Sequence, residues 1–234
     1  MKIKVIVPVY KATGKLDRLV KSLNCQTNKN WEAVLSVDAC EESYKEALIF
    51  KTENISVSLN KDRQFALGNI YSQAKSSADN NIIAIIDGDD ELCNPVCFDL
   101  ITQAYKAGAH LVWTQYCRDD HGKCVSDSIP ADCNPYEFKW SASHLRTFGN
   151  WVFNKINPEN FKDENGRFFR RAYDQALMLP MLYYCNQNNL KTTFIPEVCY
   201  KYNHSDSSTP LEEHTNGMYE HQLSKFIRSR GYIE

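Results

Sequence analysis

The sequence predicts an α/β fold, a mixed and mostly parallel central sheet flanked by helices. Over residues 1–115, short apolar runs alternate with amphipathic stretches, which is the pattern of strands connected by helices. The run "IIAII" at 82–86 is apolar throughout, as expected for a strand that is covered on both faces of its sheet. The 234 residues are 43% hydrophobic, enough to bury the core of a single α/β domain.

The elements of the first half follow from local patterns. Leu16, Leu19, Val20 and Leu23 fall on one face of a helix expected within 14–26. Strands are expected over 2–10, 31–39, 54–60, 80–88 and 109–116, and further helices over 44–51, 63–78 and 94–108. Ligands of parallel sheets bind beyond the carboxyl ends of the strands, so the polar residues found there form the expected site.

Beyond residue 116 the sequence changes character. The polar, turn-rich stretch 117–140 is a long excursion of the kind that is usually functional or disordered. A helix is expected over 167–187, and Pro180 should kink or interrupt it. A strand is expected over 191–203 and an amphipathic helix within 211–232. No internal repeat or low-complexity segment divides the chain, so one domain over 1–234 is expected.

Charge and hydropathy disfavour several classes of function. The 27 basic and 29 acidic residues are mixed along the chain, without the basic stripe of a duplex-binding protein, so nucleic acid is not favoured as a partner. The N-terminal apolar run is too short for a signal peptide, and no run approaches the roughly 18 apolar residues of a membrane span. A soluble, cytoplasmic protein is therefore expected.

The nine cysteines are scattered without the regular spacing of a disulfide scaffold, so reduced thiols are expected. One group, Cys117, His121, Cys124 and Cys133, has the residue types of a thiolate-rich zinc site. Its spacing matches no common zinc finger, which makes the zinc site the weaker of the two interpretations.

The stretch "IIDGDDEL" places Asp87, Asp89, Asp90 and Glu91 at the end of the most hydrophobic strand. Unpaired carboxylates this close repel one another, so the cluster needs solvent, protons or a cation. Gly88 relaxes the backbone between Asp87 and Asp89, which lets both turn toward one point. Mg²⁺ or Mn²⁺ would suit these oxygen ligands and would keep bonds to substrate phosphates.

Two other interpretations compete with this metal site. A calcium-binding loop is disfavoured because Leu92 and Phe98 stand where the loop requires Gly and Glu. An acidic cap for the helix that starts near residue 94 remains open, because negative charge is favoured at a helix N-terminus.

Two segments together resemble the N-terminal half of glycosyltransferase family 2. They are "VIVPVYKATGKLDRLVKSLNCQTNKNWEAVLSVDA" and "IIAIIDGDDEL". This family comprises nucleotide-sugar transferases with a GT-A (Rossmann-like) fold. The resemblance implies that residues 1–115 bind the nucleotide and that residues 116–234 bind the acceptor and supply catalytic groups.

The resemblance also assigns residues to the nucleotide-sugar donor, with a UDP-sugar as the expected donor. It implies that Pro8, Val9, Tyr10, Asp38, Asn69, Asp87 and Gly88 contact the donor and that Asp87 and Asp89 hold the metal. The family's Asp-Asp-Gly-Ser is replaced by "DACE" after the second strand, so Asp38 lacks its usual turn. The family's Ala-Arg-Asn is replaced by "ALGN", and Arg63 is the candidate for the missing charge.

The second half resembles the C-terminal part of some of these transferases. In the family, an acidic residue that opens a helix after the metal strand is the catalytic base, and "AYDQA" offers Asp174; a residue favoured by the helix dipole is the alternative. The resemblance implies His214 as a metal ligand, with His204 as the substitute. Trp140, His144 and Arg146 are candidates for binding the acceptor or a phosphate, because Arg suits oxyanions and Trp suits sugar faces.

The sequence therefore favours a metal-dependent, inverting glycosyltransferase that uses Mn²⁺ or Mg²⁺. A carboxylate would take the proton of a glycan or other hydroxyl acceptor, and the metal would stabilise the departing nucleoside diphosphate. A sugar nucleotidyltransferase is less favoured because its glycine-rich phosphate loop is missing near the N-terminus. A catalytically silent nucleotide-binding module is the remaining alternative.

Overall fold

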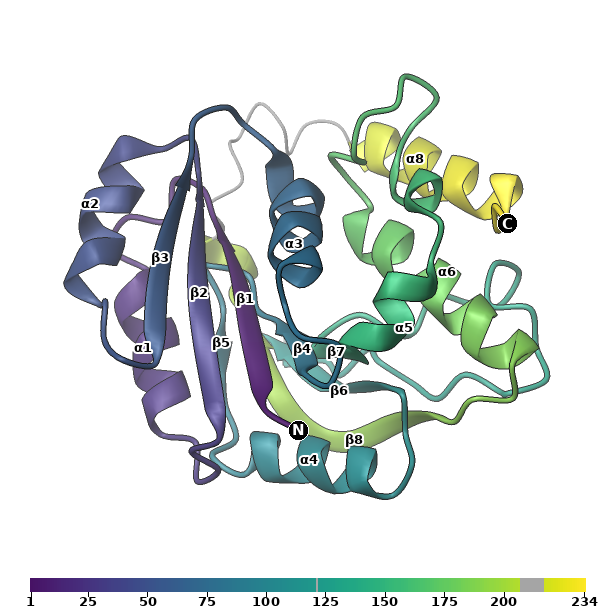
Figure 1. The fold of residues 1–234 in the computed structure, drawn as a ribbon, viewed down its shortest axis with the longest axis horizontal. Coiled ribbons are helices and arrows are strands. Elements are labelled where there is room, and N and C mark those ends of the chain that lie inside the picture. The colour runs from purple at the N-terminus through teal and green to yellow at the C-terminus, as the bar shows by residue number, and fades with distance from the viewer. Residues whose placement is uncertain (121, 207–216) are drawn as a thin grey trace.

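The computed structural model describes residues 1–120, 122–206 and 217–234 (Figure 1). The strands are β1 (Ile3–Val9), β2 (Trp31–Asp38), β3 (Ile55–Asn60), β4 (Ile82–Ile85), β5 (Glu91–Leu92), β6 (Leu111–Arg118), β7 (Arg146–Gly149) and β8 (Thr192–Tyr202). Within the described residues, they form one eight-stranded sheet in the order β3-β2-β1-β4-β7-β6-β8-β5.

The sheet is mixed and mostly parallel, which confirms the predicted fold class. The strands β1, β2, β3 and β4 pair in parallel, and β6 pairs in parallel with β8. The short strand β7 is antiparallel to both β4 and β6, and β5 is antiparallel to β8. Because β7, from the second half of the chain, lies between β4 and β6, both halves of the chain contribute to one continuous sheet.

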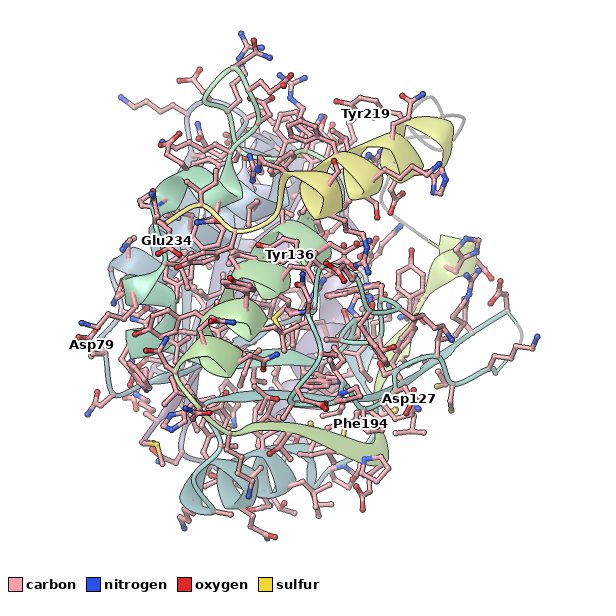
Figure 2. All side chains as sticks on the ribbon, turned by 90° about the vertical axis from the view of Figure 1, so that its right-hand side faces the viewer. Asp79, Asp127, Tyr136, Phe194, Tyr219 and Glu234 are labelled. Carbon is pink, nitrogen blue, oxygen red and sulfur yellow. The ribbon has the colours of Figure 1, made fainter. Side chains whose placement is uncertain are left out.

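Helices cover both faces of the sheet (Figure 1). The α-helices are α1 (Leu16–Asn24), α2 (Glu41–Ile49), α3 (Phe65–Lys75), α4 (Cys97–Lys106), α5 (Asn150–Lys155), α6 (Tyr173–Gln187) and α8 (Gly217–Arg230), and the 3-10 helices are η1 (Pro158–Phe161) and η2 (His204–Asp206). Successive side chains of β1 enter different cores: Val5 and Val7 pack with α1, α2 and α4, whereas Ile6 packs with α3, α5 and α6. Figure 2 shows the side chains that fill these layers.

The fold differs from the sequence-based expectation in its short elements. The strands β5 and β7 and the helix α5 were not expected, and β4 is shorter than the predicted 80–88. β7 has only four residues, "RTFG", too few for a periodic pattern; its position is decided by pairing with β4 and β6.

The interruption expected at Pro180 is absent. α6 runs continuously from Tyr173 to Gln187 although Pro180 lies inside it. Leu179 and Met181 are fully buried on either side, and this tertiary packing offsets the backbone hydrogen bond that proline cannot donate.

All nine cysteines are free thiols. Of the group considered as a zinc site, Cys117 and Cys124 pair in an isolated backbone bridge, and His121 lies outside the described residues, so this alternative is not tested as a whole. Among the residues that the structure covers, the group that could hold an ion is Asp87, Asp90 and His144. In the same part of the chain, no helix combines the length and the apolar character needed to cross a membrane.

Candidate active site

A pocket of about 460 Å³ collects side chains from both halves of the chain. It lies where β1, β2 and β4 end, as expected for a sheet of this type. Of the predicted site residues, its lining contains Pro8, Val9, Tyr10, Asp38, Arg63, Asn69, Asp87, Gly88, Asp89, His144, Arg146 and Asp174. Trp140 contacts Asp174 without lining the pocket, His204 lies at its wall, and His214 is outside the described residues.

The turn after β4 is pressed against the end of β1. The backbone N–H of Gly88 donates to the carbonyl oxygen of Pro8 over 3.2 Å. A Cβ atom at Gly88 would lie 3.0 Å from that same oxygen, so a larger residue would push the turn away from β1. Glycine therefore fixes how Asp87 and Asp89 enter the pocket.

Asp90 does not line the pocket; its carboxylate ties the turn to β8 and to the residue that follows β8. Its Oδ2 accepts a hydrogen bond of 2.6 Å from the Tyr200 hydroxyl, and its Oδ1 accepts one of 2.8 Å from the backbone N–H of Asn203. Burial raises the pKa of Asp90 well above its ordinary value. The helix-cap interpretation of the cluster does not hold, because α4 starts after Val96 without a side-chain cap.

Asp87 is held by a buried cation and a tyrosine. The hydroxyl of Tyr173 donates to Asp87 Oδ1, and a guanidinium nitrogen of Arg146 lies 3.3 Å from Asp87 Oδ2. The same nitrogen donates to the Tyr173 hydroxyl over 2.9 Å, and Arg146 is only 1% exposed. Burial raises the pKa of Asp87, and the positive charge of Arg146 opposes that shift. This triad ties the end of β4 to β7 and to the start of α6.

The donor atoms at this place suit a divalent cation. Asp87 and Asp89 bring carboxylate oxygens to the pocket, which are the ligands that Mg²⁺ and Mn²⁺ prefer. The Nδ1 atom of His144 is buried without a hydrogen-bond partner and lies 4.0 Å from Asp87 Oδ2. Burial and the nearby charge of Arg146 hold the pKa of His144 well below its ordinary value, which favours the neutral ring that a metal ligand requires.

His144 is fixed by aromatic rings. It stacks on Tyr200 with a centroid distance of 4.5 Å and on Tyr202 with 5.4 Å, and Tyr116 meets its face edge-on at 5.1 Å. With His144 only 9% exposed and Arg146 buried, both lie in the pocket's floor. Their predicted acceptor contacts stay a prediction; their observed contacts are with Asp87 and the tyrosines.

The carboxylate of Asp38 accepts two hydrogen bonds from the backbone at the start of α3. Oδ1 accepts the backbone N–H of Gln64 over 2.6 Å, and Oδ2 accepts that of Phe65 over 2.8 Å. Phe65 needs this support because its φ of 59° lies in the left-handed region. The contact of Asp38 with a donor, which the sequence suggested, stays a prediction, and any such contact must share these oxygens.

Arg63 covers the ring of Tyr10. Its guanidinium carbon lies 3.5 Å from the centroid of Tyr10 and 4.5 Å from that of Phe65, while Nε lies 3.7 Å from Asp38 Oδ2. These cation–π contacts hold the guanidinium against two aromatic rings in the wall of the pocket. Asn69, in contrast, is 1% exposed and bonds to Ser36 and Asn60, so it supports the strands behind the pocket.

Asp174 lies in the first turn of α6, beside Tyr173 and after Ala172, whose φ is 49°. The indole N–H of Trp140 donates to Asp174 Oδ2 over 2.8 Å. Asp174 and the pair Asp87 and Asp89 line the same pocket, so residues more than 80 positions apart meet there. Sequence reasoning missed Tyr173 and Tyr200: the first had a signal in its position beside Asp174, whereas the second had none.

Known proteins match this chain in sequence and in fold. The profile of Glycosyl transferase family 2 matches residues 4–177. The crystal structure of S. aureus TarS 1-349 superposes with a TM-score of 0.64 at 15% identity, over 87% of this chain and 60% of that one. The same TarS fragment in complex with UDP-GlcNAc gives a TM-score of 0.64 at 13% identity, over 88% and 60%. Its complex with UDP gives 0.61 at 15% identity, over 87% and 60%.

No curated protein matches the chain. At 13% to 15% identity, the likeness to TarS establishes the GT-A fold and not the activity. The chain spans 60% of the length of the TarS fragment.

Proposed function

The chain belongs to glycosyl transferase family 2, and on this premise we propose that it transfers a sugar from a nucleotide sugar to a hydroxyl acceptor. The observation that carries the proposal is that Asp87 and Asp89 line the same pocket as Asp174. The first two carboxylates follow a strand and are suited to hold a cation that binds the donor diphosphate. The third begins a helix and is suited to act as a general base. One pocket thus contains both kinds of group that the transfer requires.

We propose a UDP-sugar as the donor. TarS, which has the same fold, was crystallised with UDP and with UDP-GlcNAc, and this supports the choice. Pro8, Val9 and Tyr10 would line the base and ribose, with Arg63 at the rim. Residues 1–115 would then bind the donor and residues 116–234 the acceptor, within a single domain.

The proposed reaction is one displacement at the anomeric carbon. Asp174 takes the proton of the acceptor hydroxyl, and the acceptor oxygen forms its bond to the anomeric carbon. The bond from that carbon to the diphosphate oxygen breaks, and the nucleoside diphosphate leaves with the electron pair. Since the acceptor attacks from the face opposite the leaving group, the anomeric configuration is inverted.

We propose that Asp87 and Asp89, which both line the pocket, hold Mn²⁺ or Mg²⁺, with His214 as the expected ligand from outside the described residues. When bound, the cation would neutralise charge on the departing diphosphate. Arg146 and Tyr173 keep Asp87 in place from behind, so that its oxygens have a fixed position at the pocket. The acceptor is proposed as a glycan or another molecule with a free hydroxyl.

A panel of UDP-sugars, with water as the acceptor, tests this function. The protein with Mn²⁺ is expected to release UDP from at least one α-linked UDP-sugar, and EDTA should reduce the rate by at least about tenfold. Proton NMR of the first-formed sugar should show the β-anomer, since the displacement inverts the centre. Failure to release UDP from any donor would contradict the transfer, an α-anomer would contradict inversion, and indifference to EDTA would contradict metal dependence.

A further inference from the structure

The indole of Trp140 makes a direct hydrogen bond to the carboxylate proposed as the base. Nε1 donates to Asp174 Oδ2 over 2.8 Å, within the range of charge-assisted bonds. An indole N–H is a donor only, so it can neither take nor return a proton. We infer that Trp140 is a positioning residue for Asp174: it holds Oδ2 and leaves the other oxygen for the acceptor hydroxyl.

The segment that carries Trp140 is clamped to the helix that carries Asp174. The Arg228 guanidinium of α8 donates to the carbonyl oxygen of Phe138 and to the side-chain oxygen of Gln175, one residue after Asp174. The amide of Asn186 donates to the carbonyl oxygen of Cys133 over 2.8 Å. These contacts therefore hold the segment with the donor, Trp140, against the helix with the acceptor, Asp174.

Aromatic packing adds to the contacts between this segment and α6. Tyr136, labelled in Figure 2, packs edge-on against Tyr183 of α6 with a centroid distance of 6.0 Å. Trp140 itself is half-buried and packs against the apolar core to which α6 contributes. Because its ring is packed and its N–H engaged, its orientation is set before any ligand binds.

The chemical need for such a residue follows from the shape of a carboxylate. The terminal torsion of Asp is broad, so an unheld carboxylate turns both oxygens through the pocket. A base works when its oxygen lies within hydrogen-bond reach of the proton it removes, and preorganising that oxygen raises the rate. The hydrogen bond from Trp140 holds one carboxylate oxygen of Asp174 and so restricts this rotation. This role differs from sugar stacking, which would make Trp140 act on the binding of the acceptor.

The inference rests on the proposed function, and Trp140→Phe tests it by removing the N–H while keeping an aromatic ring. With a UDP-sugar that the wild type hydrolyses, kcat is expected to fall about tenfold with KM for the donor unchanged. Trp151→Phe is the matched control, because Trp151 is also half-buried but packs on His110, 5.1 Å away. A kcat of Trp140→Phe equal to that of Trp151→Phe would overturn the positioning role.

An independent readout does not need turnover. The four tryptophans give four indole N–H signals in a ¹⁵N–¹H spectrum, and the one missing in Trp140→Phe belongs to Trp140. That signal is expected to shift in Asp174→Asn, where a neutral amide replaces the carboxylate. A signal that stays fixed would contradict the contact.

The outcomes separate the inference from the function on which it rests. If Asp174→Asn keeps the wild-type turnover, the proposed base is wrong. If Asp174→Asn is inactive while Trp140→Phe behaves as Trp151→Phe does, only the positioning role of Trp140 is wrong.

Discussion

Asp174→Asn is expected to lower the turnover of a hydrolysed UDP-sugar by about a thousandfold and to leave the affinity for UDP unchanged. The amide has the size of the carboxyl group but cannot take a proton from the acceptor. Trp140 can still donate to the amide oxygen, so the start of α6 should keep its structure. Initial rates of UDP release and the Kd of UDP, measured on the same preparations, give both numbers.

The matched control for this change is Asp132→Asn, since Asp132 is exposed and lies outside the pocket lining. Its turnover should equal that of the wild type. Equal turnover in Asp174→Asn would remove Asp174 from the reaction and would favour a dipole-stabilised residue at the helix start. A thousandfold loss accompanied by lost UDP binding would point instead to a collapsed pocket.

Arg146→Met is expected to lower the free energy of unfolding by about 3 kcal/mol. The substitution keeps much of the buried volume but leaves the Asp87 carboxylate, whose side chain is only 21% exposed, without its cation. Tyr173 would lose a hydrogen-bond partner and the guanidinium packed 4.9 Å from its ring. Urea unfolding followed by tryptophan fluorescence measures the change.

Arg118→Met provides the comparison, because the ion pair of Arg118 with Asp120 is partly exposed, at 26% and 30%. Such pairs contribute up to about 1 kcal/mol, so this variant should stay close to the wild type. Asp87→Asn combined with Arg146→Met should be more stable than Arg146→Met alone, because the uncompensated charge is gone. Equal stability of Arg146→Met and Arg118→Met would show that the buried pair does not hold the triad together.

The parts of the fold that could be predicted are those with a long local pattern. The apolar runs around Val5, Leu35 and Ile83 and the helical face of Leu19 specify β1, β2, β4 and α1, because periodicity and burial agree there. The strand β7 could not be predicted, since its four residues are ordered by the strands on either side. The helix α6 also continues through Pro180, because tertiary packing there overrides a local preference to end the helix.

The site was predictable as a set of polar strand ends but not as a network. Local sequence singled out Asp87 and Asp89, the family resemblance singled out Asp174, and the structure brings all three to one pocket. Local sequence could not show that Arg146 contacts Asp87 or that Trp140 donates a hydrogen bond to Asp174, because these pairs are 59 and 34 residues apart. Contacts at that range depend on the whole fold and leave no periodic signal.

The most direct test of the account is a calorimetric titration of UDP against the protein, with and without Mn²⁺, in the wild type and in Asp89→Ala. Asp89 lines the pocket and is the residue whose carboxylate is proposed to join metal and diphosphate. The account predicts that UDP binds at least about tenfold more tightly with Mn²⁺ and that Asp89→Ala removes this gain. A UDP affinity that changes neither with Mn²⁺ nor with the substitution, or no binding of UDP at all, would contradict a metal-dependent nucleotide-sugar site.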